Sequence, residues 1–281
     1  MRLTRFTHEG VTRNGRIEGD SVIDLSDVAA SGDSMRVLLE AAGSDLGKLA
    51  AVHGRRFALA DVHLEAPITD PQKFLAIGMN YEAHAEEARA AGVPVPDSQL
   101  WFNKQVSCIN GPTDPVVMPK VSDMLDYEAE LGFVIGKKCR HVNAADAYSV
   151  IAGFLVVNDV SVRDWQMRSQ TMTLGKSFDT HGPIGPWITT VDEIGDPEKR
   201  SLKLWVDGEL KQDAVTDDLI YDVGAQIEYL STVMTLFPGD LIATGTPSGV
   251  GAATGSWLKV GQTMKVAIDG LGELENTIVA E

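Results

Sequence analysis

Two acidic residues interrupt an otherwise apolar, strand-like stretch near the middle of the 281-residue chain. Glu128 and Glu130 are separated by one alanine and are followed directly by the apolar run LGFVI at residues 131–135. In a strand, alternate side chains share a face, so these two carboxylates would project together from Cα atoms about 6.5 Å apart. Burying an unpaired charge is strongly unfavourable, so a bound cation would be the natural compensation. Taken alone, the pattern also fits a strand whose acidic face lies in water.

A third acid extends the cation hypothesis. Residues 154–158 have the composition of a buried strand, and Asp159 follows directly at the end of that strand. This is where a third ligand would stand against Glu128 and Glu130. A set of oxygen ligands without a thiolate favours Mg²⁺, Mn²⁺ or Ca²⁺ over Zn²⁺. The three acids therefore predict a site for a hard divalent cation.

The composition narrows the class of protein. Lys and Arg number 24 against 40 Asp and Glu, for a formal net charge of −16. Such an excess repels polyphosphates and anionic membranes, so we expect neither nucleic acid nor a membrane as a partner. The two thiols, Cys108 and Cys139, fit a reduced compartment rather than a disulfide framework. The N-terminus lacks the apolar core of a signal peptide, and we expect a cytoplasmic protein.

The chain divides at residues 66–71, where two prolines and an aspartate mark a junction. Residues 1–68 predict a small N-terminal α+β domain, with strands near residues 3–6 and 22–25 around a turn at residues 14–15. A helix that begins after Ser34 and ends at Gly43, and a second short helix over residues 46–52, complete this domain. Residues 69–281 form the second domain and hold every candidate functional residue.

A predicted helix over residues 81–91 carries a candidate acid–base pair. His84 and Glu87 lie three residues apart on one face of this helix, so the carboxylate could orient the imidazole and raise its basicity. The alternative is an exposed surface pair, because the helix is rich in Ala and Glu.

Other candidate polar residues follow the acidic strands. Arg163 and Gln166 share one face of a predicted helix, although Arg163 could instead pair with Asp126 or Asp164. Residues 174–187 are too rich in Gly and Pro for a helix or a central strand, which predicts an ordered loop.

The remaining candidate site residues lie in loops or next to a predicted strand. Lys176 could bring a fixed positive charge into a site or be an ordinary surface lysine. His181 is a candidate for polar lining, with a hydrogen-bonded loop histidine as the alternative. Lys104, after a predicted strand at residues 100–102, is expected to be solvated. The loop TGTPSGVG at residues 244–251 could hold a carboxylate with its backbone N–H groups and the Thr246 hydroxyl.

Four motifs in a fixed order give the chain a family resemblance. They are YEAEL at residues 127–131, NDVSVRD at 158–164, GKSFD at 175–179 and TGTPSGVG at 244–251. From about residue 73 onward, the chain resembles the fumarylacetoacetate hydrolase family and its smaller acylpyruvate hydrolase members. The resemblance implies an α+β fold whose β-rich mixed sheets curl into a roll, a bound Mg²⁺ or Mn²⁺, and a homodimer.

The resemblance also implies roles for particular residues. Glu128, Glu130 and Asp159 match the metal ligands of the family. The matches to its catalytic residues are His84 and Glu87, which would activate water, and Lys176. The residues that we assign to substrate binding on the same ground are Tyr81, Arg163, Gln166 and Thr246.

Three departures from the family pattern concern the expected substrate pocket. Met79 replaces an arginine that many members carry before Asn-Tyr, and residues 169–172 replace a stretch that usually contains Gly-Gln-Trp. His181 stands where an aromatic residue is common. These departures leave the acyl group of the substrate open and do not touch the expected metal ligands.

The expected reaction is hydrolysis of a carbon–carbon bond in a 2,4-dioxo acid, giving pyruvate and a carboxylic acid. The substrate would be a small 2-oxo acid of the acylpyruvate or diketo-deoxy sugar acid type. Decarboxylation of an oxaloacetate-like acid, or isomerisation of an unsaturated 2-oxo acid, would use the same site without an attacking water. A cation that merely ties strands together is a further alternative, but it would leave Lys176, His84 and Glu87 without a role.

Overall fold

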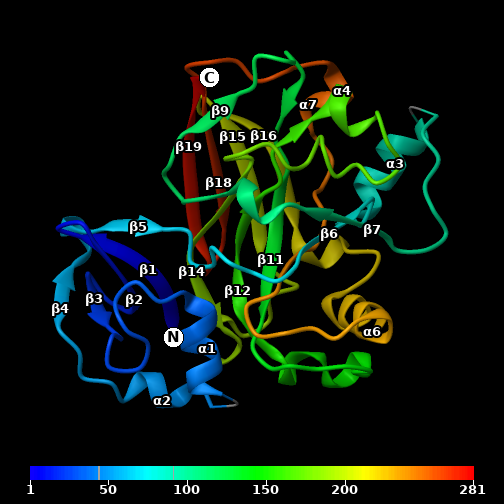
Figure 1. Ribbon diagram of the computed structural model, residues 1–281. Coiled ribbons are helices and arrows are strands. Elements are labelled where there is room, and N and C mark those ends of the chain that lie inside the picture. Colours follow the sequence, from blue (N-terminus) through cyan, green and yellow to red (C-terminus); the bar gives the residue numbers. More distant parts are fainter. Residues whose placement is uncertain (44, 91) are drawn as a thin grey trace.

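The protein is a mixed α+β molecule built around one large sheet (Figure 1). The computed structural model describes residues 1–43, 45–90 and 92–281. In this part of the chain twelve strands form the main sheet, in the order β4 (Arg56–Ala58), β3 (Ser21–Asp24), β2 (Val11–Glu18), β1 (Arg2–His8), β14 (Gly182–Thr190), β12 (Ile151–Asn158), β11 (Ala129–Ile135), β17 (Leu241–Ala243), β6 (Phe74–Gly78) and β7 (Leu100–Lys104), with β5 (His63–Glu65) paired to β1 and β8 (Ile109–Asn110) paired to β14.

A smaller sheet and several short helices surround the main sheet. The smaller sheet has the order β16 (Glu209–Val215), β15 (Ser201–Val206), β18 (Thr263–Ile268), β19 (Gly272–Ala280) and β9 (Val116–Met118), and β10 (Leu125–Asp126) pairs with β13 (Ser161–Val162). The α-helices are α1 (Met35–Ala42), α2 (Gly47–Ala50), α3 (Glu82–Ala90), α4 (Arg163–Gln166), α5 (Val191–Ile194), α6 (Val223–Val233) and α7 (Gly251–Thr254). The 3₁₀ helices are η1 (Leu59–Asp61), η2 (Val106–Cys108), η3 (Ala144–Ser149) and η4 (Thr216–Asp218). The expected fold class, with β-rich mixed sheets in an open roll, is confirmed.

The two central strands β11 and β12 are buried along their whole length. One face of this pair packs on the smaller sheet, where Phe133 and Phe154 meet Leu204 and Val266. The opposite face packs on a second core, to which Leu155 belongs. The strands of the smaller sheet instead alternate buried and half-buried residues, because only one of their faces is covered. The unbroken apolar runs of β11 and β12 therefore reflect cover on both faces.

The N-terminal segment extends the main sheet. β1 pairs with β14, with Arg2 opposite Thr189 and Leu3 opposite Ile188, so strands on both sides of residue 68 share one sheet. The division into domains at residue 68 stays a prediction. The predicted turn at residues 14–15 is wrong, because both residues lie inside β2. The Asn14 amide instead donates to the Asp33 carbonyl oxygen at 3.1 Å, so its side chain anchors the segment before α1.

The expectation of a loop throughout residues 174–187 is also wrong. Residues 182–187 belong to β14, a strand in the interior of the main sheet. Its pairing with β12 shifts register between Phe154 and Val156, and Pro186 falls opposite that irregularity. A proline is tolerated in a sheet at such a bulge, because no ladder hydrogen bond is lost there.

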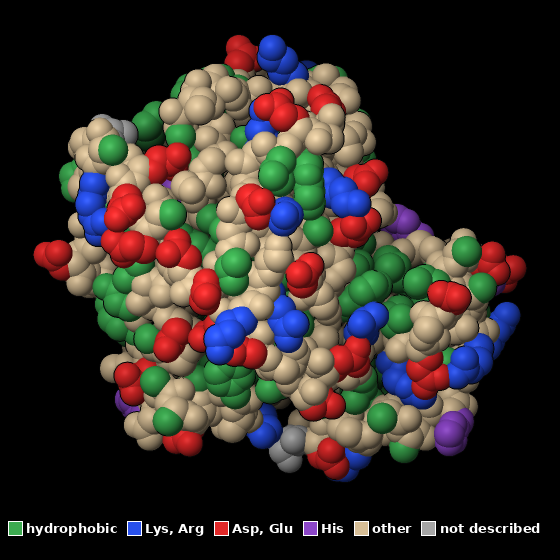
Figure 2. All heavy atoms as spheres, turned by 180° about the vertical axis from the view of Figure 1, so that it is seen from behind, with side chains coloured by type: hydrophobic (Ala, Val, Ile, Leu, Met, Phe, Trp, Pro, Cys, Tyr) green, Lys and Arg blue, Asp and Glu red, His purple; other side chains and the backbone are tan. Residues whose placement is uncertain are grey.

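Most of the other predicted elements are present with small shifts. The helix expected after Ser34 is α1, and Gly43 ends it with a φ of 65°. The helix expected over residues 81–91 is α3, except that residue 91 lies outside the described residues. Within the described ranges, every helix is too short or too polar to cross a membrane. On the face seen in Figure 2, acidic and basic side chains are interspersed.

Candidate active site

Three predicted acids meet where β11 begins and β12 ends. Asp159 follows β12, and its backbone N–H donates to the Glu128 carbonyl oxygen at 2.9 Å. The Glu128 N–H donates in turn to Oδ1 of Asn158 at 3.1 Å, which holds the two chain segments together. One carboxylate oxygen from each of Glu128, Glu130 and Asp159 lies within 4.8 Å of the others. The side chains are buried, so the alternative of an acidic face in water is wrong.

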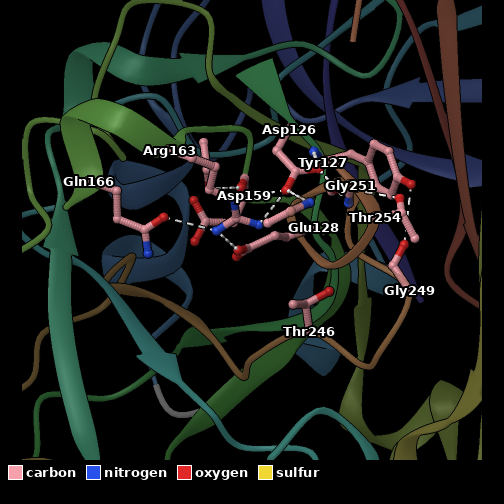
Figure 3. A network of polar contacts seen from close by, with 12 residues as sticks. Asp126, Tyr127, Glu128, Asp159, Arg163, Gln166, Thr246, Gly249, Gly251 and Thr254 are labelled. Atoms are coloured by element: carbon pink, nitrogen blue, oxygen red, sulfur yellow. Dashed lines mark hydrogen bonds and ion pairs between the residues drawn. The ribbon is translucent and has the colours of Figure 1, made fainter. Parts of the chain in front are cut away.

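Three cations neutralise part of this buried acidic cluster, and Figure 3 labels one of them, Arg163, beside Glu128 and Asp159. Nζ of Lys176 contacts Oε2 of Glu128 at 2.6 Å and Oδ2 of Asp159 at 2.8 Å. Nη1 of Arg163 lies 2.6 Å from Oε1 of Glu128. Nζ of Lys104 lies 2.6 Å from Oδ1 of Asp159. Each oxygen of Glu128 and Asp159 therefore has a cationic partner.

A fourth acid, Asp126, fixes the position of Arg163. The Arg163 Nε and Nη2 atoms both lie 2.8 Å from Oδ2 of Asp126. Asp126 also accepts hydrogen bonds from the backbone N–H groups of Gly251 at 2.8 Å and Ala252 at 2.9 Å. Nη1 of Arg163 donates further to Oε1 of Gln166 at 2.9 Å. The alternative that Arg163 pairs with Asp126 is confirmed, and the same guanidinium also reaches the acidic cluster.

Glu130 is the member of the cluster left without a cation. Among the described residues, its carboxylate accepts a hydrogen bond from the Gly245 N–H at 2.8 Å and forms no ion pair. Burial, together with the negative charges of Asp159 and Glu128, raises the pKa of Glu130 well above its usual value. Burial would also raise the pKa of Glu128, but the positive charges of Lys176 and Arg163, with the hydrogen bond from Lys176, together outweigh it and hold that pKa low. Four acids thus face three cations, and Glu130 is the acid without a cationic partner among the described residues.

The cluster has the chemistry of a hard-cation site. It offers three carboxylate oxygens within 4.8 Å of one another, without a thiol or an imidazole in the set. Mg²⁺ and Mn²⁺ prefer such oxygen donors. The uncompensated charge of Glu130 gives a cation an electrostatic reason to bind there. The residues present therefore fit a divalent ion.

A cavity of about 90 Å³ opens beside the acids. The predicted site residues that line it are His84, Glu128, Glu130, Arg163, Gln166, Lys176 and Thr246. Tyr81 is not among the described lining residues; it is fully buried, and this burial raises the pKa of its phenol. Asp159 lies behind the lining, where it holds two of the cations.

The candidate acid–base pair lies at the rim of this cavity. Nδ1 of His84 and Oε2 of Glu87 are 3.1 Å apart on α3, as their spacing predicts. His84 lines the cavity, so its imidazole is not part of a purely exposed surface pair. The segment before α3 is anchored by Asn80, whose amide donates to the Thr244 carbonyl oxygen at 2.8 Å and whose Oδ1 accepts from the Tyr221 N–H at 2.8 Å.

Two lysines are more deeply buried than the sequence suggested. Lys176 is 2% exposed, so the alternative of an ordinary surface lysine is wrong. Lys104 was expected to be solvated, but it too is 2% exposed, because it ends β7 on the same face as the buried Phe102. Its ammonium also donates to the Lys176 carbonyl oxygen. The sequence could have indicated the burial of Lys104 only if the predicted strand had been extended from residue 102 to residue 104, because alternate residues of a strand share a face.

Gln212 is a second residue that sequence reasoning did not identify. Its Nε2 donates to Oγ1 of Thr246 at 2.9 Å, and its Oε1 accepts from the Ala129 N–H at 2.9 Å. Thr246 donates its own hydroxyl proton to the Ala129 carbonyl oxygen at 2.9 Å. The Thr246 hydroxyl is therefore held in place by the scaffold, and its single proton is not free for a substrate carboxylate. No local sequence pattern links Gln212 on β16 to this loop.

His181 does not line the cavity, contrary to the expected position of that departure. It is a fully buried histidine whose Nε2 donates to the Val117 carbonyl oxygen at 2.8 Å, and its Nδ1 has no hydrogen-bond partner in the described part of the chain. The alternative of a hydrogen-bonded histidine is confirmed. Burial lowers its pKa from 6.5 to about 4, because a second proton on Nδ1 would place an unpaired charge in the core.

Acid should therefore destabilise the protein through His181. The unfolded chain binds a proton near pH 6.5 and the folded chain only near pH 4, so stability falls as pH falls between these values. The expected loss from pH 8 to pH 5 is about 2 kcal/mol of unfolding free energy from this residue. Urea unfolding of wild type and His181→Gln at both pH values measures it. An equal pH dependence in the two proteins would contradict this assignment.

Comparisons with known proteins place this geometry in a family. The model of the fumarylacetoacetate hydrolase C-terminal domain matches residues 73–279, and the Rv2993c-like N-terminal model matches residues 1–67. A protein of Burkholderia ambifaria, whose name describes it no further than as a hydrolase, is 42% identical over 282 residues, with 97% of each chain covered.

Solved structures agree with the family models. The maleylpyruvate hydrolase of Sphingobium sp. SYK-6, in complex with manganese(II) ion and pyruvate, is 35% identical, with a TM-score of 0.80 and coverage of 100% of this chain and 99% of that one. The 5-carboxymethyl-2-hydroxymuconate delta-isomerase of Mycobacterium smegmatis is 34% identical, with a TM-score of 0.82 and full coverage of both chains. The family thus includes enzymes named for hydrolysis and for isomerisation. With both family models and relatives of this similarity matched along its length, the chain belongs to the fumarylacetoacetate hydrolase family.

Proposed function

We propose that this chain is a divalent-cation-dependent hydrolase that cleaves a carbon–carbon bond in a 2,4-dioxo acid to give pyruvate and a carboxylic acid. The observation that carries the proposal is the buried triad Glu128, Glu130 and Asp159 beside a cavity lined by both His84 and Lys176. A purely structural cation would not call for an imidazole and an ammonium at the same cavity. The manganese and pyruvate in the Sphingobium relative support the choice of Mg²⁺ or Mn²⁺ and of a 2-oxo acid.

The triad would hold the cation, and the side chains around it would carry the proton transfers. A bound Mg²⁺ or Mn²⁺ would supply Lewis-acid polarisation of a chelated 2-oxo acid. With Nδ1–H of His84 donating to Glu87, Nε2 is the atom that can take a proton from water. The water oxygen would attack the 4-carbonyl carbon, and the C3–C4 bond would break to leave the pyruvate enolate.

Lys176 is suited to the charge that this bond cleavage creates. Glu128 and Asp159 fix its ammonium at the edge of the cavity, so it can stabilise a developing oxyanion without moving far. The proton that C3 needs to form pyruvate would come from water or from an ammonium N–H of Lys176. Arg163 and Gln166 would orient the substrate from the same wall, and Thr246 would shape the pocket rather than donate a proton. Tyr81, fully buried, would support the site from behind.

Product analysis tests the proposal directly. The purified protein should release equal amounts of pyruvate and carboxylic acid from acylpyruvates or diketo-deoxy sugar acids with Mg²⁺ or Mn²⁺, and the rate should fall by several orders of magnitude after thorough chelation. Coupled detection of pyruvate with chromatography of the acid measures both products. A rate that survives chelation undiminished would overturn the role of the cation.

Isomerisation by the same site is the second candidate, favoured by the isomerase named among the solved relatives, and decarboxylation would use the same site. Neither reaction uses an attacking water, so the discriminating residue is His84. Conversion of an unsaturated 2-oxo acid, or carbon dioxide from oxaloacetate, with acylpyruvates left intact would favour this candidate. The homodimer and the cytoplasmic location stay predictions.

A further inference from the structure

We propose that the substrate carries no charge at the end of its acyl group, so that the site takes monocarboxylate rather than dicarboxylate 2,4-dioxo acids. This inference rests on the proposed function and names the substrate class for the same site. It follows from two properties of the cavity: the cations that line it are already engaged by buried acids, and the remaining wall is apolar.

The permanent cations among the described lining residues are Arg163 and Lys176. Arg163 directs Nε and Nη2 to Asp126 and Nη1 to Glu128 and Gln166, so four of its N–H groups have partners. Lys176 has two carboxylate partners, and the face of the Phe102 ring lies 4.9 Å from Nζ. Drawing either cation towards a second substrate carboxylate would leave a buried acid uncompensated. Both cations are therefore held beside the acids, where they can meet substrate charge, and neither can move to a carboxylate at the far end of the acyl group.

Five of the lining side chains are apolar, and we refer to them as the apolar wall. Ile77 and Met79 come from the end of β6 and the turn after it, Leu100 and Phe102 from β7, and Met172 from the loop after α4. Their sulfur and hydrocarbon atoms offer no strong hydrogen-bond donor to a carboxylate.

The polar groups between the two walls also have partners. Oε1 of Gln166 accepts from Arg163, and its Nε2 lies 3.4 Å from the Met172 sulfur. Nδ1 of His84 donates to Glu87, so its Nε2 carries no proton that it could donate to a carboxylate. An alkyl group placed against this wall gains from burial, whereas a carboxylate there would lose its hydration without a counter-charge. The cavity can thus compensate a charge beside the acids, where the cation would bind, but not a charge placed against the apolar wall.

Matched pairs of 2-oxo acids test the inference without any turnover. 2-Oxopentanoate and 2-oxopentanedioate differ only by a terminal carboxylate, as do 2-oxohexanoate and 2-oxohexanedioate. Isothermal titration of the Mn²⁺-loaded protein should give a Kd at least about tenfold lower for the monocarboxylate of each pair. Dicarboxylates that bind as tightly as the monocarboxylates would overturn the inference, and so would binding of neither.

A cation added to the apolar wall should reverse the preference. Met79→Arg should tighten binding of the dicarboxylates by about tenfold or more, whereas the uncharged Met79→Leu should keep the preference of wild type. Leu100→Arg adds the same charge from β7 and covers the case in which Met79→Arg fails to fold. If the charged variants that fold bind dicarboxylates no better than wild type, the inference is wrong. The proposed function is tested separately, by pyruvate release from acylpyruvates. If no pyruvate is released but the binding preference is observed, the proposed reaction is wrong and the inference about the substrate stands.

Discussion

Replacing Glu130 with Gln is expected to abolish binding of the divalent cation and hydrolysis, yet to leave the cation-free protein more stable than wild type. The substitution removes the one charge of the cluster that has no cationic partner among the described residues, and an amide oxygen can still accept the hydrogen bond from Gly245. Without the negative charge, repulsion from Asp159 and Glu128 is relieved. Loss of a charged ligand should at the same time cost several orders of magnitude in rate.

The sign of the stability change depends on pH. A carboxyl whose folded-state pKa is raised contributes stability below its unfolded pKa and loses it as pH rises through the folded value. The advantage of Glu130→Gln should therefore grow with pH, reaching about 1–3 kcal/mol at pH 8 in chelator. Urea unfolding with EDTA measures it, and Mn²⁺ should stabilise wild type but not the variant. A variant less stable than wild type at pH 8 would contradict this assignment of charge.

Glu128→Gln is the matched control, since it makes the same chemical change two residues away. Glu128 holds both Lys176 and Arg163, so its loss leaves two buried cations with one carboxylate fewer. The expected cost is about 3–5 kcal/mol in the same cation-free unfolding experiment. Both variants should lose activity, but their effects on stability should have opposite signs. The experiment thereby distinguishes, among the acids of one cation site, the acid without a cationic partner from the acid that is ion-paired.

The acidic cluster was predictable because its signals are local. Glu128 and Glu130 stand beside an apolar run, and Asp159 ends another, so each pattern fixes both a strand and the position of a carboxylate on it. The expected α+β class follows from such runs together with the four ordered motifs.

The Asp207-Gly208 turn between β15 and β16 has positive φ at both residues, as a tight hairpin of this kind requires.

The sequence-based predictions were wrong where segments distant in the sequence determine a residue's environment. Lys104 looks solvated beside Pro- and Gly-rich sequence, but β7 carries it under Asp159, fifty-five residues later. β14 looks like a loop because Pro186 is judged without the irregular pairing to β12 that accommodates it. Asn14 has the composition of a turn residue, but in the structure its amide donates a hydrogen bond to the backbone before α1. In each case a tertiary contact outweighed the local preference.

The same limit explains why the charge balance of the site was out of reach from sequence. Spacing could suggest that Arg163 meets Asp126, and it does. It could not show that Lys104 and Lys176 together engage both oxygens of Asp159. Only this complete set of pairs leaves Glu130 as the surplus charge, on which the first prediction depends.

Replacing His84 with Ala is expected to lower the hydrolytic kcat by about 10²–10⁴-fold, the usual contribution of a general base. The imidazole lines the cavity, and its Nδ1 is paired with Glu87, which leaves Nε2 to accept the proton of water. None of the three carboxylates of the cation site contacts His84 in a hydrogen bond or ion pair within the described residues, so Mn²⁺ affinity should stay close to that of wild type. Calorimetric titration of Mn²⁺ and steady-state kinetics measure the two effects separately.

Two further variants on α3 test whether the loss of kcat depends on the hydrogen-bonded pair of His84 and Glu87. Glu87→Gln should cause a smaller loss than His84→Ala, because a neutral amide can still accept the hydrogen bond but stabilises the protonated imidazole less. Glu86→Gln makes the same change one residue earlier, on an exposed side chain, and should leave the rate unchanged. Full hydrolysis by His84→Ala would remove the base from the mechanism. Loss of acylpyruvate cleavage with undiminished decarboxylation of oxaloacetate would instead show that His84 serves the attacking water alone, since that second reaction needs the 2-oxo acid site and no water.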